Sequence, residues 1–241
     1  MSNLLVTTAC LWDNPEPVAK LEESCEYLGL DFSYYGIKTV FTNWKQAKVD
    51  LLIDHLINDN HDYVLFTDGF DSWMLKGEED IMDNFNSFRK EIVISAEQNC
   101  YPLNQYIEQF PPTATSFRYP CAGQFMGERE ALLKALTLLK TRYMNMDFGG
   151  EGTAHKHNDQ TLWQAAYLEN RLSLALDDTC RLFLSAGSLK IEDFSMTNGE
   201  LKINEPNTYA PCSVHFNGPK GGSTPEVNMN LIYDIYKGCR V

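Results

Sequence analysis

Residues 64–73 read VLFTDGFDSW, an apolar run that passes directly into a turn with two carboxylates. A continuous apolar run is typical of a strand that is buried on both faces of a parallel sheet. Open α/β sheets bind ligands at the carboxyl ends of such strands. Asp68 and Asp71 therefore predict a hard, oxygen-rich site suited to Mn²⁺ or Mg²⁺. The alternative is that Asp68 and Gly69 only form a turn, with Asp71 as a solvated surface charge.

Strand and helix patterns alternate on both sides of this run, which is the signature of an α/β layer. The helix expected at 44–57, for example, repeats its apolar residues at helical spacing. The second half is less regular, with a hairpin at 194–203 that turns at Asn198-Gly199. Strands are predicted at 4–9, 31–35, 63–66, 92–95, 172–176, 181–185 and 214–216, and helices at 15–28, 44–57, 77–88, 130–143, 160–168 and 227–236.

No repeat, linker or low-complexity tract divides the 241 residues, so one mixed α/β domain is predicted over 1–241. Its formal charge is −13, with 7 basic and 18 acidic side chains in 1–100 and 13 and 15 in 101–241. A protein that wraps nucleic acid with its whole surface should be basic, so this charge excludes that class. The overall charge does not exclude a local basic groove formed by the second half of the chain.

Seven scattered cysteines include no C-x-x-C pair, which argues against a structural zinc site. An odd number of cysteines and a first segment without a basic signal region fit reduced thiols in a cytosol. No apolar run approaches the roughly 20 residues that a membrane helix needs. We therefore expect a cytoplasmic protein that makes no use of a membrane.

A second informative segment, SVHFNGPKGG at 213–222, brings an imidazole, a glycine turn and a lysine together. His215 is a candidate third metal ligand through a neutral ring nitrogen. Gly218 lets the backbone approach a phosphate, which Lys220 neutralises. Taken alone, a histidine on a strand is more often a structural residue with a satisfied ring.

Five patches follow one another along the chain: D-x-x-D at 68–71, SAEQNCYP at 95–102, G-x-F-x-G at 123–127, NDQ at 158–160 and HFNGPK at 215–220. In this order they resemble the glycosyltransferase domain of the procollagen lysyl hydroxylase family and its single-domain viral and phage relatives, and more distantly glycogenin-type enzymes. The resemblance spans about residues 4–220. It implies a GT-A fold, a Rossmann-like mixed sheet flanked by helices, that binds a UDP-sugar with Mn²⁺ or Mg²⁺.

The resemblance also implies roles for single residues. Asp68, Asp71 and His215 would hold the metal, and Asp71 and Asp159 would be the catalytic carboxylates, with Asp159 contacting the donor sugar. Residues 1–100 would form a nucleotide-binding half, and residues 101–241 an acceptor-side half. Contacts to the donor are expected from Thr7, Thr8, Trp44, Lys48, Phe70, Gly123, Gln124, Asn217, Gly218 and Lys220.

Several of these positions also have plain structural interpretations. Asp159 fits a helix cap, Trp44 could anchor its helix, and Phe70 could be a core aromatic. The chain departs from the family where residues 43–46 lack a glycine-rich loop, and where Cys121 and Ala122 replace a polar pair. Contacts to the donor are expected to differ at these two places.

The resemblance implies transfer of a sugar to an acceptor hydroxyl with retention of the anomeric configuration. The acceptor is either hydroxymethylated cytosine in phage DNA or a hydroxyl on a protein or glycan. The charge of −13 counts against tight DNA binding. Two other classes are a catalytically inactive module that binds sugar nucleotides or carbohydrates, and a phosphohydrolase, which the lack of a second acidic cluster disfavours.

Overall fold

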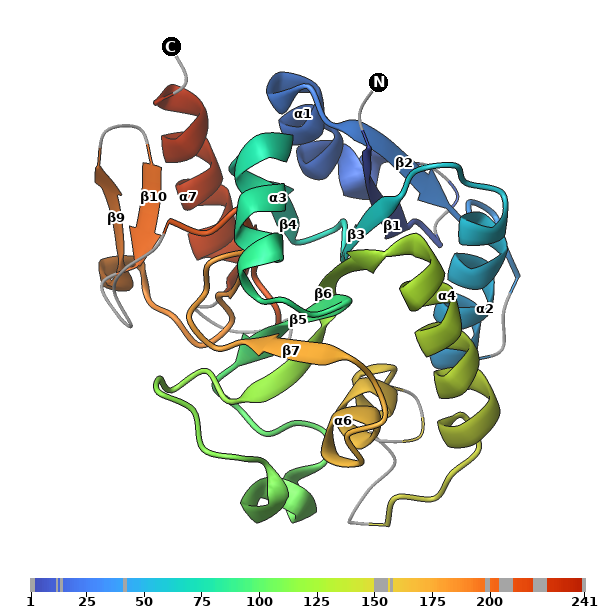
Figure 1. Ribbon diagram of the computed structural model, residues 1–241. Helices are drawn as coiled ribbons and strands as arrows, with labels where there is room; N and C mark the ends of the chain where they lie inside the picture. Colours follow the sequence, from blue (N-terminus) through green and yellow to red (C-terminus); the bar gives the residue numbers. More distant parts are fainter. Residues whose placement is uncertain are drawn as a thin grey trace.

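The computed structural model describes residues 3–11, 13, 15–40, 43–149, 156, 158–197, 200–203, 210–218 and 225–239. A six-stranded sheet forms its centre (Figure 1), in the order β2 (Asp31–Tyr35), β1 (Leu4–Ala9), β3 (Tyr63–Thr67), β6 (Tyr119–Glu128), β5 (Ile92–Glu97) and β7 (Leu174–Asp177). β1 is parallel to β2 and β3, and β5 is parallel to β7. β6 is antiparallel to both of its neighbours, β3 and β5, so the sheet is mixed.

Helices cover both faces of this sheet, which confirms the predicted α/β architecture. Successive strand residues point to opposite faces, so a strand covered on both sides must be apolar throughout. Phe66 stacks on Phe125 at 4.8 Å, and the ring of Phe125 lies 4.7 Å from that of Trp163. Leu65 and Met126 pack into the core on the other face. One face carries α2 (Trp44–Ile57), α4 (Arg129–Leu138) and α6 (Gln160–Leu168), and the other carries α1 (Ala19–Leu28) and α3 (Glu78–Ser87).

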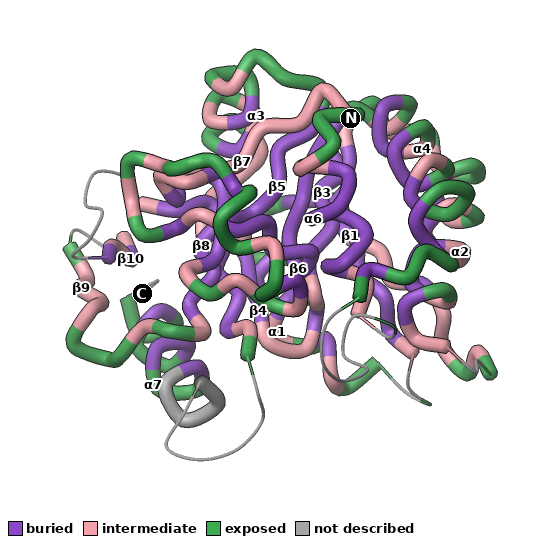
Figure 2. Tube along the Cα trace, turned by 90° about the horizontal axis from the view of Figure 1, so that it is seen from below, coloured by how far each residue is buried: buried purple, intermediate pink, exposed green. Residues whose placement is uncertain are grey.

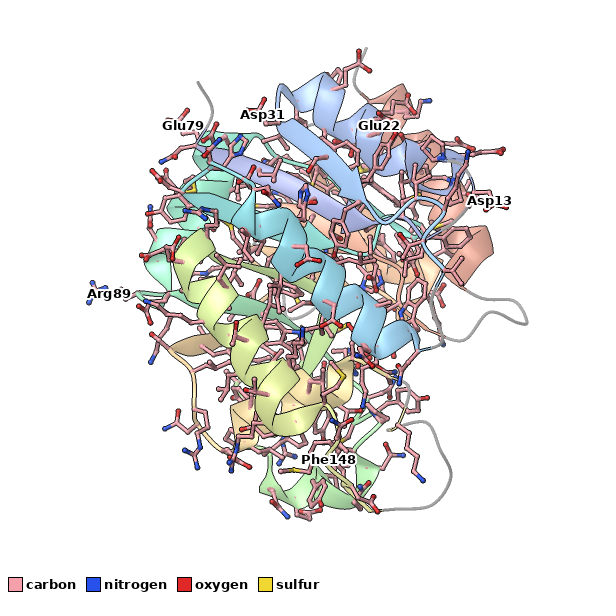
Figure 3. All side chains as sticks on the ribbon, turned by 90° about the vertical axis from the view of Figure 1, so that its right-hand side faces the viewer. Asp13, Glu22, Asp31, Glu79, Arg89 and Phe148 are labelled. Carbon is pink, nitrogen blue, oxygen red and sulfur yellow. The ribbon has the colours of Figure 1, made fainter. Side chains whose placement is uncertain are left out.

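Burial follows this layering. Figure 2 shows the inner strands β1, β3, β6 and β5 of the central sheet largely buried, with most of the exposed residues on the helices and loops around them. The edge strands β2 and β7 are mostly half-buried. α2 and α4 lie side by side across one face (Figure 3). Among the described residues, no helix is both long enough and apolar enough to cross a bilayer.

A second, three-stranded sheet continues from the end of β3. It has the order β4 (Ser72–Met74), β11 (Ser213–His215) and β8 (Phe183–Ser185), with β11 antiparallel to β4 and parallel to β8. The C-terminal helix α7 (Pro225–Gly238) packs on it, since Trp73 stacks on Phe216 at 5.3 Å and meets Tyr233 edge-on at 5.0 Å. The turn after β3 and the strand with His215 are therefore direct neighbours.

Two strands were not predicted from the sequence. β6 lies at the centre of the main sheet, but Pro120, Gly123, Gln124 and Gly127 interrupt its apolar pattern. Glycine and proline are normally weak strand residues, so the pattern favoured an irregular segment. β4 has only three residues, too few for a periodic signal.

The predicted ends of the other elements differ in detail. A short 3₁₀ turn over Glu16–Val18 precedes α1, so the helix starts later than expected. Asn14, a residue type that commonly caps helices, lies outside the described residues. Asn43 caps α2, because its Oδ1 accepts a hydrogen bond from the Gln46 N–H. The hairpin is confirmed as β9 (Phe194–Thr197) paired with β10 (Glu200–Ile203), and its turn also falls outside the described residues.

Candidate functional site

A cleft of about 830 Å³ opens where β3, β5 and β11 end. Parallel strands deliver side chains at their carboxyl ends to the same edge of a sheet, which is the usual ligand position in α/β folds. Residues from both halves of the chain line the cleft. They are Trp44, Asp68, Asp71, Glu97, Asn99, Tyr101, Cys121, Ala122, Gly123, Asn158, Asp159, Gln160, Gly187, Ser188, His215, Asn217 and Gly218.

Backbone hydrogen bonds fix the turn that carries Asp68 and Asp71. The Asp68 N–H donates to the Gly123 carbonyl at 2.8 Å, which ties the turn to β6. The Phe216 N–H donates to the Asp71 carbonyl at 2.8 Å, which ties it to the end of β11. Both carboxylates remain partly exposed and line the cleft.

His215 meets these two carboxylates from the neighbouring strand. Its Nε2 lies 3.2 Å from Asp71 Oδ1 and 3.9 Å from Asp68 Oδ2, and its side chain is only 4% exposed. Burial opposes the charged imidazolium, but the Asp71 carboxylate and the Cys121 side chain together raise the pKa of His215 well above its usual value. The trio predicted from the sequence therefore converges on one wall of the cleft.

Only glycine fits opposite the His215 ring. A Cβ at Gly123 would lie 2.0 Å from His215 Cε1 and 2.4 Å from Nδ1, which is far inside contact distance. The imidazole thus occupies the space that any other residue at 123 would need. This contact explains the glycine in the small-residue segment of β6.

Lys48 joins Asp68 to Asp159. Its Nζ lies 2.7 Å from Asp68 Oδ1 and 2.9 Å from Asp159 Oδ2, and 4.8 Å from the centre of the Phe66 ring. Burial alone would lower the pKa of Lys48, but the two carboxylates raise it above its usual value. Lys48 is therefore a fixed cation behind the cleft wall that orients both acidic side chains.

The chemistry of this trio fits a hard divalent cation, because carboxylate oxygens and an imidazole nitrogen suit Mn²⁺ or Mg²⁺. As they stand, the described residues form no group of three His, Cys, Asp or Glu side chains arranged to hold a metal ion. Instead, Asp68 Oδ1 contacts Lys48 and His215 Nε2 contacts Asp71. A metal ligand must give up its proton, so a cation would compete with these contacts.

Glu97 is a cleft residue that sequence reasoning did not select. Its Oε1 accepts a bond from Gln160 Nε2, and its Oε2 accepts one from Asn217 Nδ2 at 2.8 Å. Burial raises the pKa of Glu97 from 4.5 to about 7. The signal in the sequence was the same as for Asp68, a carboxylate at the end of a buried strand.

Replacing Glu97 by Gln is expected to flatten the pH dependence of the free energy of unfolding. Because the pKa of Glu97 is higher in the folded state, that state binds more protons between about pH 4.5 and 7. The free energy of unfolding should therefore fall as the pH rises through this window, by roughly 3 kcal/mol. Urea denaturation across the window measures the slope in both proteins.

The exposed Glu108, replaced by Gln, is the matched control and should keep the wild-type slope. The comparison concerns slopes, because the amide introduced in place of the Glu97 carboxyl faces two amide donors and has a cost of its own at every pH. An unchanged slope in E97Q would contradict the assignment.

The other predicted site residues fall into three groups. Trp44, Asp159, Asn217 and Gly218 line the cleft together with the trio and Gly123. Lys220 lies outside the described residues. The third group does not line the cleft: Thr7, Thr8 and Gln124 are fully buried, Lys48 is nearly so, and Phe70 is half-buried on the turn.

Comparison with known proteins gives the family of this chain. The sequence model described as "PLOD GT domain" matches residues 2–231. The chain belongs to this family. Procollagen-lysine,2-oxoglutarate 5-dioxygenase 1 of Bos taurus is 24% identical over 162 residues, which are 65% of this chain and 21% of that protein. Protein R699 of Acanthamoeba polyphaga mimivirus is 24% identical over 165 residues, which are 68% of this chain and 32% of R699.

The PLOD GT chain thus spans about a fifth of the length of the procollagen-lysine relative and about a third of the viral one. A solved structure supports the fold. The crystal structure of a glycosyltransferase involved in the glycosylation of the major capsid of PBCV-1 has a TM-score of 0.53 at 12% identity, over 96% of this chain and 98% of that one. The resemblance to the glycosyltransferase domain of the procollagen lysyl hydroxylase family is confirmed. The mixed α/β sheet has a GT-A-like fold.

Proposed function

We propose that this PLOD GT protein transfers a sugar from a UDP-sugar to an acceptor hydroxyl with the help of Mn²⁺ or Mg²⁺. The observation that carries the proposal is the approach of His215 Nε2 to Asp71 Oδ1 at 3.2 Å and to Asp68 Oδ2 at 3.9 Å on one wall of the cleft. Two strands from distant parts of the chain supply these groups. An arrangement that needs a glycine opposite the ring is more specific than a structural histidine requires.

Asp68, Asp71 and His215 would hold the cation. When bound, a divalent ion neutralises the negative charge that develops on the departing diphosphate. Lys48 adds a preorganised positive charge on the same side of the cleft. Asp159, which Lys48 orients, would stabilise positive charge on the sugar carbon as the bond to phosphate breaks.

We further propose that the transfer proceeds on one face of the sugar, with retention. Glu97 is a poor nucleophile because both of its oxygens accept amide hydrogen bonds. The departing phosphate oxygen would then take the proton of the acceptor hydroxyl while that hydroxyl attacks the sugar carbon. Glu97 has a positioning role in this scheme, since Asn217 and Gln160 are fixed by it.

The proposed acceptor is a hydroxyl group of a glycan or a protein, in uncharged surroundings, rather than a hydroxyl group on DNA. Beyond Glu97, neutral side chains line the cleft, namely Asn99, Tyr101 and Ser188. Tyr101 is 47% exposed and offers an aromatic face to a sugar. None of the described residues that line the cleft is a lysine or arginine, whereas a DNA acceptor needs cations along its phosphates.

The test offers UDP-hexoses and Mn²⁺ to the protein with free glycans, hydroxylysine peptides and hydroxymethylated DNA side by side. Mass spectrometry identifies the product, and NMR gives the configuration of the new linkage. We expect a retained linkage on a glycan or peptide and no product in EDTA. An inverted product would refute the same-face scheme, and modified DNA would refute the acceptor. UDP binding without hydrolysis or transfer would favour an inactive binding module.

A further inference from the structure

A buried carboxamide lies directly behind the metal-binding wall. Gln124, on β6, is fully buried, and its Nε2 donates to Thr67 Oγ1 at 3.2 Å and to Ser213 Oγ at 2.7 Å. Thr67 is the last residue of β3, immediately before Asp68. Ser213 is the first residue of β11, the strand that ends with His215. One amide therefore joins the two strands that supply the three proposed ligands.

The chain of hydrogen bonds continues into the turn itself. Thr67 Oγ1 donates to Ser72 Oγ at 2.8 Å, and Ser72 Oγ donates to the Asp68 carbonyl. Each hydroxyl accepts one bond and donates the next, so the direction of the chain is set by the NH₂ group of Gln124. The two hydroxyls are fully buried, and they hold the residues on either side of Asp68–Asp71.

The other branch controls the histidine. Side chains at positions i and i+2 of a strand point to the same face, so Ser213 and His215 lie on the same side of β11. The hydrogen bond from Gln124 on β6 to Ser213 therefore fixes the position of β11, and with it the His215 side chain, relative to β6. Gly123, the residue before Gln124 on β6, leaves the space that the His215 ring fills.

We infer that Gln124 is a positioning residue that sets the spacing between the Asp68–Asp71 turn and His215, and through it the affinity for the divalent cation. This inference rests on the metal site of the proposed function. The sequence predicted that Gln124 contacts the UDP-sugar directly. Its burial excludes this contact, because an enclosed side chain that does not line the cleft cannot reach a ligand there. Hydroxyl and amide groups in such a chain reinforce one another, so the loss of one weakens the rest.

The experiment measures Mn²⁺ binding by electron paramagnetic resonance, in which free Mn²⁺ gives the signal. The variants are Gln124→Met, which keeps the side-chain length without its donors, and Ser72→Ala, which breaks the chain inside the turn. We expect the Kd for Mn²⁺ to rise about tenfold in Gln124→Met and several-fold in Ser72→Ala, the range expected for losing buried hydrogen bonds.

The matched control is Ser24→Ala. Ser24 is also fully buried, donates to the Leu21 carbonyl and accepts from the Met74 N–H at the far end of β4. Its loss should lower thermal stability as much as the loss of Ser72 but leave the Kd for Mn²⁺ unchanged. If the hydrogen-bond chain had a purely structural role, all three variants would lose thermal stability alike, and none would change the Kd for Mn²⁺.

The outcomes separate the two proposals. If the wild-type protein binds no Mn²⁺, the metal site of the proposed function is wrong, and the inference fails with it. If the wild-type protein binds Mn²⁺ and both variants bind it equally well, only the inference is overturned. Should Gln124→Met not fold, Ser72→Ala and Thr67→Val, which remove single hydroxyls, give the same decision.

Discussion

Replacing Asp71 by Asn should lower sugar transfer by about 10²–10³-fold, the loss typical of removing one preorganised electrostatic group. The Asp71 carboxylate lies 3.2 Å from His215 Nε2 and lines the cleft, so its charge serves both the imidazole and the proposed cation. Asn keeps the shape of the side chain, and the bond from Phe216 to the Asp71 carbonyl involves only the backbone. The fold should therefore survive while activity is lost.

Initial rates of product formation with a UDP-sugar and saturating Mn²⁺ measure this effect, and circular dichroism checks the fold. Asp68→Asn should behave alike, because Asp68 also loses its pairing with Lys48. Asp83→Asn, on α3 and away from the cleft, is the matched control with the same chemical change. Wild-type rates in Asp71→Asn, or rates that survive EDTA, would rule out the metal role.

The strands predicted best are those buried on both faces. β1, β3 and β5 consist of residues that face helices on one side or the other, so their apolar runs reveal them without any alternation. β6 is equally buried but carries Gly123 and Gln124, because one makes room for His215 and the other bonds to two hydroxyls. Two of the four residues that hide β6 in the sequence, Gly123 and Gln124, thus serve the site.

The same contrast holds within the site. Asp68, Asp71 and Glu97 follow buried strands, so their positions at the sheet edge can be predicted from local sequence. The pairing of Lys48 with Asp159 links the middle of α2 to the start of α6, and no local pattern encodes that contact. The resemblance to the family supplied Lys48 and Asp159 as donor contacts, but only the structure shows that each one orients the other.

The single methyl group that Gly123→Ala adds should disrupt the proposed metal site. In Gly123→Ala the new Cβ would lie 2.0 Å from His215 Cε1, against a buried ring that cannot swing away like the end of a flexible side chain. The backbone at Gly123 is outside the left-handed region, so the effect comes from space alone and not from strain in φ. Overpacking of this kind costs about 1–3 kcal/mol of stability.

We expect Gly123→Ala to fold with a lower melting temperature and to lose Mn²⁺ binding and transfer together, because His215 must leave the position that faces Asp68 and Asp71. Paramagnetic resonance of Mn²⁺ and thermal denaturation measure the two effects on one sample. Gly238→Ala is the control, since a Cβ there meets no atom within 4 Å. Normal Mn²⁺ affinity in Gly123→Ala would mean that the position of His215 does not matter to the cation, and His215 would no longer be a ligand.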